Sequence, residues 1–227
     1  LFLENHDNPR MVSKVEKDPA FHEKLSMLLL TLQLTLKGTP FIYQGQEMGL
    51  SNIDFHSIEE MQDIESINLY RELLAQKKTP EEAFRIVLSG SRDHARAMID
   101  WANADPCEAA KRGHVQGYLK KLATIRRDHR TLIYGETLFT NREKKNLFTY
   151  FRSDREETWY VECNLCNHEI RRSKRDLTAA SVKDCRAHGN YGNTRDGVLR
   201  PYECNIYHLD QGDGVGGSFF DDRRKRT

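Results

Sequence analysis

The chain has 227 residues, of which 38% are hydrophobic and 30% charged, and its 35 basic and 34 acidic residues leave a formal net charge of +1. This balance argues against a nucleic acid or an anionic membrane surface as partner. The length suits one large domain or two ordinary ones, and no apolar run approaches the ~20 residues that a membrane span needs.

The first part of the chain reads as strand, helix, strand. Residues 1–7 are predicted to end a buried parallel strand, since an apolar tip runs directly into Asn-His-Asp and a proline turn. Residues 19–37 have leucines at helical spacing, with Asp18 as the N-cap. Residues 40–43 form a second short apolar strand. A helix between two strands indicates a parallel sheet, and polar groups gather past both strand ends, where α/β barrels build their active sites.

Further helices are expected up to residue 129. Residues 57–76 are predicted to begin at the N-cap Ser57, and residues 79–87 at a capping box. Residues 90–101 read as an extended, arginine-rich stretch, and residues 113–129 as a basic amphipathic helix.

The pattern changes near residue 131. Short runs rich in aromatic and β-branched residues, bounded by charged turns, predict strands at residues 132–135, 147–151, 158–161 and 202–209. Several such strands in succession indicate an antiparallel β domain. The glycine-rich and then strongly charged tail, residues 211–227, is expected to be disordered.

Three motifs follow one another along the chain, at residues 5–10 (NHDNPR), 38–49 (GTPFIYQGQEMG) and 91–96 (SRDHAR). Together they resemble the α-amylase superfamily of retaining glycoside hydrolases (glycoside hydrolase family 13). Within it the chain is most similar to the oligo-1,6-glucosidase and α-glucosidase branch, which includes trehalose-6-phosphate hydrolases. The resemblance covers roughly residues 1–101 and 114–209.

The resemblance implies a fold that is α/β followed by all-β. Residues 1–129 would be the C-terminal part of a (β/α)8 TIM barrel, containing its strands seven and eight. Residues 130–210 would form an antiparallel β-sandwich domain. Because a whole barrel takes about 250 residues, the chain is expected to be a C-terminal fragment of a longer enzyme.

The resemblance also implies roles for individual residues. Asp7 matches the third acidic residue of the family's site, where a carboxylate binds sugar hydroxyls and favours a positively charged ring. His6 would donate to neighbouring hydroxyls. Arg92 matches an arginine that contacts the innermost glucose; the alternative is that it, or Arg96 four residues on, is a surface or structural arginine. The nucleophile and the acid/base would lie on strands four and five, ahead of Leu1.

We therefore expect a fragment of a retaining α-glucosidase that acts on short, isomaltose-like oligosaccharides with α-1,6 links, and we expect the fragment alone to be inactive. No redox or other cofactor is expected. One alternative is a trehalose-6-phosphate hydrolase of the same family. Another is a non-catalytic, glycosidase-like interaction subunit, suggested by a shortened loop before residue 113.

The five cysteines form no compact framework, so reduced thiols and a cytoplasmic location are expected. Cys163-x2-Cys166 precedes Cys185-x2-His188 by 18 residues, a spacing similar to zinc-ribbon ligands. Cysteine is also a common small buried residue, and residues 160–164 fall where the family has an ordinary strand. We therefore expect no metal site, and a zinc-bearing binding module is the weakest alternative.

Overall fold

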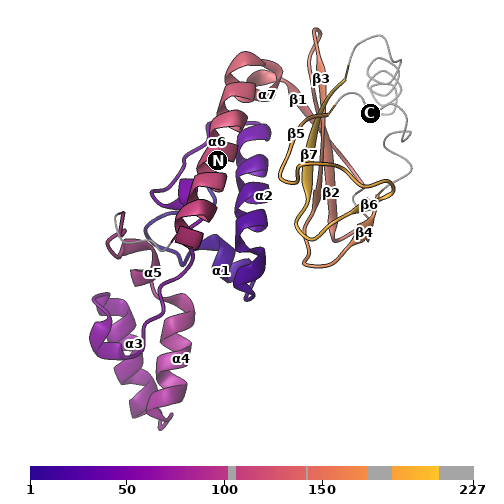
Figure 1. Cartoon of the computed structure of the whole chain (residues 1–227). Coiled ribbons are helices and arrows are strands. Elements are labelled where there is room, and N and C mark those ends of the chain that lie inside the picture. Colours follow the sequence, from indigo (N-terminus) through magenta and orange to yellow (C-terminus); the bar gives the residue numbers. More distant parts are fainter. Residues whose placement is uncertain (102–105, 142, 173–185, 210–227) are drawn as a thin grey trace, which may run out of the picture.

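The computed structural model describes residues 1–101, 106–141, 143–172 and 186–209 (Figure 1). In these ranges a helical part comes first and an antiparallel sheet follows it. Among the described residues, no helix is long and apolar enough to cross a membrane. The tail predicted to be disordered, residues 211–227, lies outside the described ranges.

The two segments predicted as parallel strands lie side by side but are too sparsely paired to be regular strands. The Leu1 ammonium donates to the Thr39 carbonyl at 2.7 Å, and the Leu1 carbonyl accepts from the Phe41 N–H at 2.9 Å. This is the hydrogen-bond pattern of a single parallel bridge. The prediction of two strands is therefore wrong, because two hydrogen bonds do not make a ladder. The prediction that the first segment is buried is also wrong, since Leu1 and Phe2 are exposed. Beside Leu1 the two segments run parallel. The second segment runs into a short 3-10 helix, η2 (Gln46–Met48).

The first long helix forms as its capping signal predicts. A short helix, α1 (Met11–Val15), is followed by η1 (Pro19–Phe21) and α2 (His22–Thr35). The Asp18 carboxylate accepts the Ala20 N–H at 2.9 Å, which confirms it as an N-cap. Most of α2 is buried, so this helix lies inside the molecule.

The next helix begins later than predicted. Ser57 precedes only a 3-10 turn, η3 (Ile58–Glu60), whereas Asp63 caps α3 (Ile64–Ala75) by accepting the Ser66 N–H. The extended backbone of Met61 at the end of η3 separates the two elements. The predicted start at Ser57 is therefore wrong.

The capping box before the following helix, α4 (Pro80–Gly90), is confirmed. Thr79 and Glu82 each accept the other's backbone N–H at 3.2 Å. After α4 the arginine-rich stretch is not extended as predicted, because it contains a helical turn, α5 (Asp93–Arg96).

The last long helix, α6 (Pro106–Asp128), packs along α2 (Figure 1). The residues after it were predicted to be a strand, but they form a helical turn, α7 (Thr131–Tyr134). The buried Arg152 explains this difference, since it binds the carbonyls of Thr131 and Leu132 and so replaces sheet partners.

The antiparallel β region is confirmed. Its sheet has the order β1-β2-β3-β7-β5. These strands are β1 (Glu136–Thr140), β2 (Leu147–Ser153), β3 (Thr158–Asn164), β7 (Cys204–Leu209) and β5 (Arg186–Gly189). A separate two-stranded sheet pairs β4 (Ile170–Arg171) with β6 (Val198–Leu199). The β-sandwich stays a prediction.

One main apolar core joins the helices to the sheet. It contains Leu28 and Leu30 of α2, Leu122 of α6, and Trp159 and Ile206 from one face of the sheet. The core therefore runs across the domain boundary predicted at residues 129 and 130, which itself stays a prediction.

Candidate active site

The Asn-His-Asp segment forms a tight turn on the surface. The Asn5 side-chain oxygen accepts the Asp7 N–H at 3.0 Å and the Asn8 amide at 2.8 Å, the arrangement of an Asx turn. The side chains of Asp7 and His6 remain 48% and 65% exposed, with the His6 Nε2 3.3 Å from the Asp7 Oδ2. The turn therefore presents a carboxylate and an imidazole together to solvent.

A buried ion pair fixes this turn to the second extended segment. Arg10 contacts the Glu4 carboxylate at 3.2 Å and donates to the Gln44 carbonyl at 2.7 Å. Burial raises the pKa of Glu4, although the Met11 N–H and Arg10 act in the opposite direction. Gly45 adopts a left-handed φ of +88°, and a Cβ there would come within 2.9 Å of the Arg10 guanidinium. Glycine is therefore required at the point where the two segments meet.

Arg96 is the arginine that holds Asp7. Its terminal nitrogen donates to the Asp7 Oδ1 at 2.8 Å, and its Nε donates to the His6 carbonyl at 2.8 Å. Arg92 comes only within 3.8 Å of the same Asp7 oxygen. The structure therefore brings the three predicted site residues together, and it adds Arg96, which the sequence left open as a structural arginine.

Arg92 forms its hydrogen bonds with the N-cap of α3. Its terminal nitrogen and Nε lie 2.6 and 3.2 Å from the Asp63 Oδ1. Burial tends to raise the pKa of Asp63, but the hydrogen bonds from Arg92 and Ser66 outweigh it and lower that pKa. The same bond to Asp63 raises the pKa of Arg92. Sequence reasoning did not select Asp63 as a site residue, because it placed the start of this helix earlier, at Ser57.

The chemistry of this cluster follows from which oxygens are occupied. Asp63 is buried and its two oxygens are taken by Ser66 and Arg92, whereas Asp7 is half exposed. Asp7 can therefore accept hydrogen bonds from a ligand while the two nearby guanidiniums offset its charge. A ligand rich in hydroxyl groups fits this arrangement.

Comparison with known proteins places the chain in a family. The family described as "Alpha amylase, catalytic domain" matches residues 1–135, more than half of the chain. The chain belongs to this family.

The relatives in this family carry names of glycosidases. An oligo-1,6-glucosidase from Halalkalibacterium halodurans is 32% identical over 91% of the chain and 42% of its own length. A trehalose-6-phosphate hydrolase from Bacillus subtilis is 28% identical over 92% of the chain and 42% of its own length. The chain thus spans about two fifths of the curated relatives that it matches.

Solved structures of the same family superpose on most of the chain. Trehalose-6-phosphate hydrolase from Bacillus licheniformis matches with a TM-score of 0.79 and 26% identity, over 93% of this chain and 43% of that one. Isomaltulose synthase from Klebsiella sp. LX3 matches with a TM-score of 0.80 and 27% identity, over 92% and 42%.

The cysteine spacing does not form a metal site among the described residues. Cys163 is fully buried in the main core, Cys166 hydrogen-bonds to Asn164, and the ring of His188 stacks on Tyr118. The remaining candidate, Cys185, lies outside the described residues.

Proposed function

We propose that this chain is the C-terminal part of a retaining α-glucosidase that hydrolyses short α-linked glucosides with 1,6 links. The observation that carries the proposal is the Asp7 carboxylate, which is exposed beside His6 and hydrogen-bonded by Arg96 where two parallel segments end. Relatives named oligo-1,6-glucosidase support the reaction class and the linkage.

In this proposal, residues 1–7 and 39–45 occupy the positions of strands seven and eight in the (β/α)8 barrel of the longer enzyme. Their apolar side chains support this, since Phe2 and Phe41 are 58% and 64% exposed. Large exposed apolar side chains on adjacent segments suit surfaces that other parts of a longer protein cover.

Each residue of the cluster has a role in the proposed reaction. Asp7 accepts hydrogen bonds from ring hydroxyls and stabilises the oxocarbenium-like transition state. Arg96 fixes the position of that carboxylate, Arg92 supplies a second positive charge 3.8 Å from it, and His6 donates to a neighbouring hydroxyl. These four groups bind and stabilise, but they do not break the glycosidic bond.

Bond cleavage requires a nucleophile and an acid/base about 5 Å apart. We assign these two carboxylates to the part of the barrel that precedes strand seven in the longer relatives. The 227-residue chain by itself is therefore expected to show no α-glucoside hydrolysis. Turnover of a chromogenic α-glucoside by the purified chain would contradict this assignment.

The proposal is tested in a chimera. The segment of the Halalkalibacterium halodurans relative that precedes the matched region is fused to this chain, and isomaltose hydrolysis is measured. Asp7→Asn should lower kcat about 10²- to 10³-fold, because it removes a charge aimed at the transition state. Asp128→Asn is the matched control, since Asp128 is equally exposed, at 49%, at the far end of α6. Equal activity of the two variants would contradict the role assigned to Asp7.

A trehalose-6-phosphate hydrolase is the second candidate, favoured by the similarity to such enzymes in sequence and in structure. A second chimera, with the preceding segment of the Bacillus subtilis relative, is assayed with trehalose 6-phosphate. Higher activity in this chimera than in the first would favour the second candidate. Two folded but inactive chimeras would instead favour the non-catalytic interaction subunit.

A further inference from the structure

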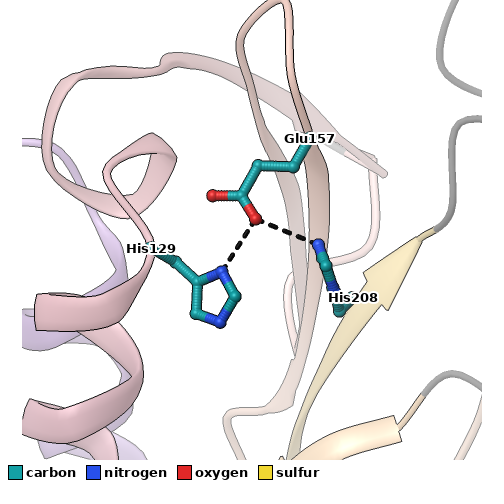
Figure 2. A group of neighbouring side chains, drawn as sticks. All are labelled: His129, Glu157 and His208. Atoms are coloured by element: carbon teal, nitrogen blue, oxygen red, sulfur yellow. Dashed lines mark hydrogen bonds and ion pairs between the residues drawn. The ribbon is translucent and has the colours of Figure 1, made fainter.

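Two histidines and a glutamate form a second cluster of side chains, far from Asp7 in the sequence. This cluster lies where the end of α6 meets the sheet (Figure 2). His129 directly follows α6, Glu157 directly precedes β3, and His208 lies in β7. The Glu157 Oε2 is 2.8 Å from the His129 Nδ1 and 3.0 Å from the His208 Nε2. Within the described ranges, this is the one group of three potential metal ligands whose donor atoms all lie within 4.8 Å of one another.

The two imidazoles are oriented by a buried tryptophan. Trp159 pairs directly with His208 across β3 and β7, and their rings stack with centroids 4.4 Å apart and planes at 19°. The His129 ring meets Trp159 edge-on, with a centroid distance of 4.5 Å. Because Trp159 is only 1% exposed, both rings are held in place by the main core.

The carboxylate is positioned by the hairpin between β2 and β3. The Asp154 Oδ1 accepts the backbone N–H groups of Glu156 and Glu157, at 2.9 and 3.0 Å. The Asp154 N–H in turn donates to the Glu157 carbonyl at 3.2 Å. The three donor atoms are therefore supported by the helix end, the hairpin and the sheet, which is the preorganisation that a metal site needs.

We propose that His129, Glu157 and His208 bind a divalent transition metal ion of the zinc class. Two imidazole nitrogens and one carboxylate oxygen suit such ions, and bonds of about 2.0–2.2 Å require donor atoms about 3.4 Å apart. The observed 2.8 and 3.0 Å are shorter than this, so binding requires side-chain rotations that move the Glu157 oxygen away from the two nitrogens. The side chains are 32%, 17% and 37% exposed, so a fourth position faces solvent and admits a water ligand.

The bound ion ties the end of α6 to two strands of the sheet. It replaces the contacts that the single Glu157 oxygen otherwise makes with both histidines. Since binding to the folded state alone stabilises it by mass action, zinc raises the thermal stability of the chain. His129 and Glu157 are 28 residues apart in the sequence, and Glu157 and His208 are 51 apart. Such long separations do not form a recognisable metal-binding motif.

The test uses the whole 227-residue chain, freed of metal with a chelator. Calorimetric titration with zinc chloride should give one-to-one binding, and zinc should raise Tm. His208→Ala and Glu157→Gln should each weaken binding at least about 10-fold. Glu157→Gln keeps a side-chain oxygen that accepts hydrogen bonds, so its circular dichroism should match that of the parent chain. His56→Ala is the matched control, because His56 is an exposed histidine outside the cluster.

Cobalt(II) reports which atoms bind. Nitrogen and oxygen ligands give weak visible bands without the strong near-ultraviolet absorption of a cobalt–thiolate bond. The proposal is overturned by any one of three results: no stoichiometric uptake of zinc, a strong thiolate band, or unchanged affinity in both ligand variants. The last result would mean that the two histidines and the carboxylate contact one another without binding a metal ion.

Discussion

At the scale of single residues, the position of Asp7 depends on Arg96. Two nitrogens of one guanidinium bind the turn, one on the Asp7 carboxylate and one on the His6 carbonyl. A lysine has a single ammonium on a flexible stem and does not reproduce this fork. Arg96→Lys should therefore lower kcat/KM in the chimera about 10- to 100-fold, the value of one charge-assisted hydrogen bond. The control Arg127→Lys, in an exposed pair with Asp128, should leave kcat/KM unchanged.

Asp63 makes the folded state sensitive to acid. Its pKa is lowered because the hydrogen bonds of Arg92 and Ser66 outweigh the burial that acts to raise it. A carboxyl group whose pKa is lower in the folded than in the unfolded state stabilises the fold above about pH 4, the unfolded value. That stabilisation is lost as the pH falls through the folded pKa.

The side chain at position 63 no longer titrates in the Asp63→Asn variant. As the pH is lowered below about 4, the free energy of unfolding of this variant should therefore fall less steeply than that of the parent chain. Urea unfolding from about pH 3 to pH 6 measures both slopes. The exposed Asp54→Asn serves as control and should keep the parent slope. Identical slopes in all three proteins would show that Asp63 does not carry the acid sensitivity.

At the scale of elements, one buried arginine joins the helices to the sheet. Arg152 on β2 is fully buried, and burial lowers its pKa to about 10. Its two terminal nitrogens donate to four backbone carbonyls, those of Thr35, Thr131, Leu132 and Gly135. These carbonyls lie at the end of α2 and along α7, where helix ends leave acceptors unsatisfied.

Arg152→Lys should lower the free energy of unfolding by at least about 2 kcal/mol, because three donors on one nitrogen cannot reach four separated carbonyls. Chemical denaturation of the parent chain and the variant measures the difference. Arg127→Lys, on the exposed end of α6, is the control and should change little. A loss for Arg152→Lys as small as the control's would mean that the carbonyls find other donors.

The sequence predicts elements well where the signal is local. Asp18, Thr79 and Glu82 lie within three residues of the N–H groups that they cap, so these helix starts were readable. The strand predicted after residue 131 is wrong because its apolar residues favour a strand, whereas its carbonyls bind Arg152, about twenty residues later in the chain. The contact of Arg96 with Asp7 spans 89 residues. The order of the motifs predicts that the segments containing Asp7 and Arg96 belong to one site. Only the fold shows which arginine contacts the Asp7 carboxylate.

At the scale of the whole molecule, the hairpin of α3 and α4 stands apart from the main body (Figure 1). It has a small apolar core of its own, made by Met61, Leu73, Ala83 and Val87. A small separate core gives local opening a low free energy. Backbone amides of α3 and α4 should therefore exchange hydrogen faster than those of β2 and β3, as mass spectrometry of exchanged peptides measures. Equal protection of both regions would contradict this difference.

The main core has a consequence for how this fold can be divided. Helices α2 and α6 supply one side of that core and the sheet supplies the other. A cut near residue 130 leaves two pieces, each with a large apolar face in water, so neither is a suitable unit for expression. Chimeras between members of the family are limited in the same way. A sheet from one protein packs well only if α2 and α6 come from that protein too, because the side chains of the sheet and of the two helices are complementary in shape.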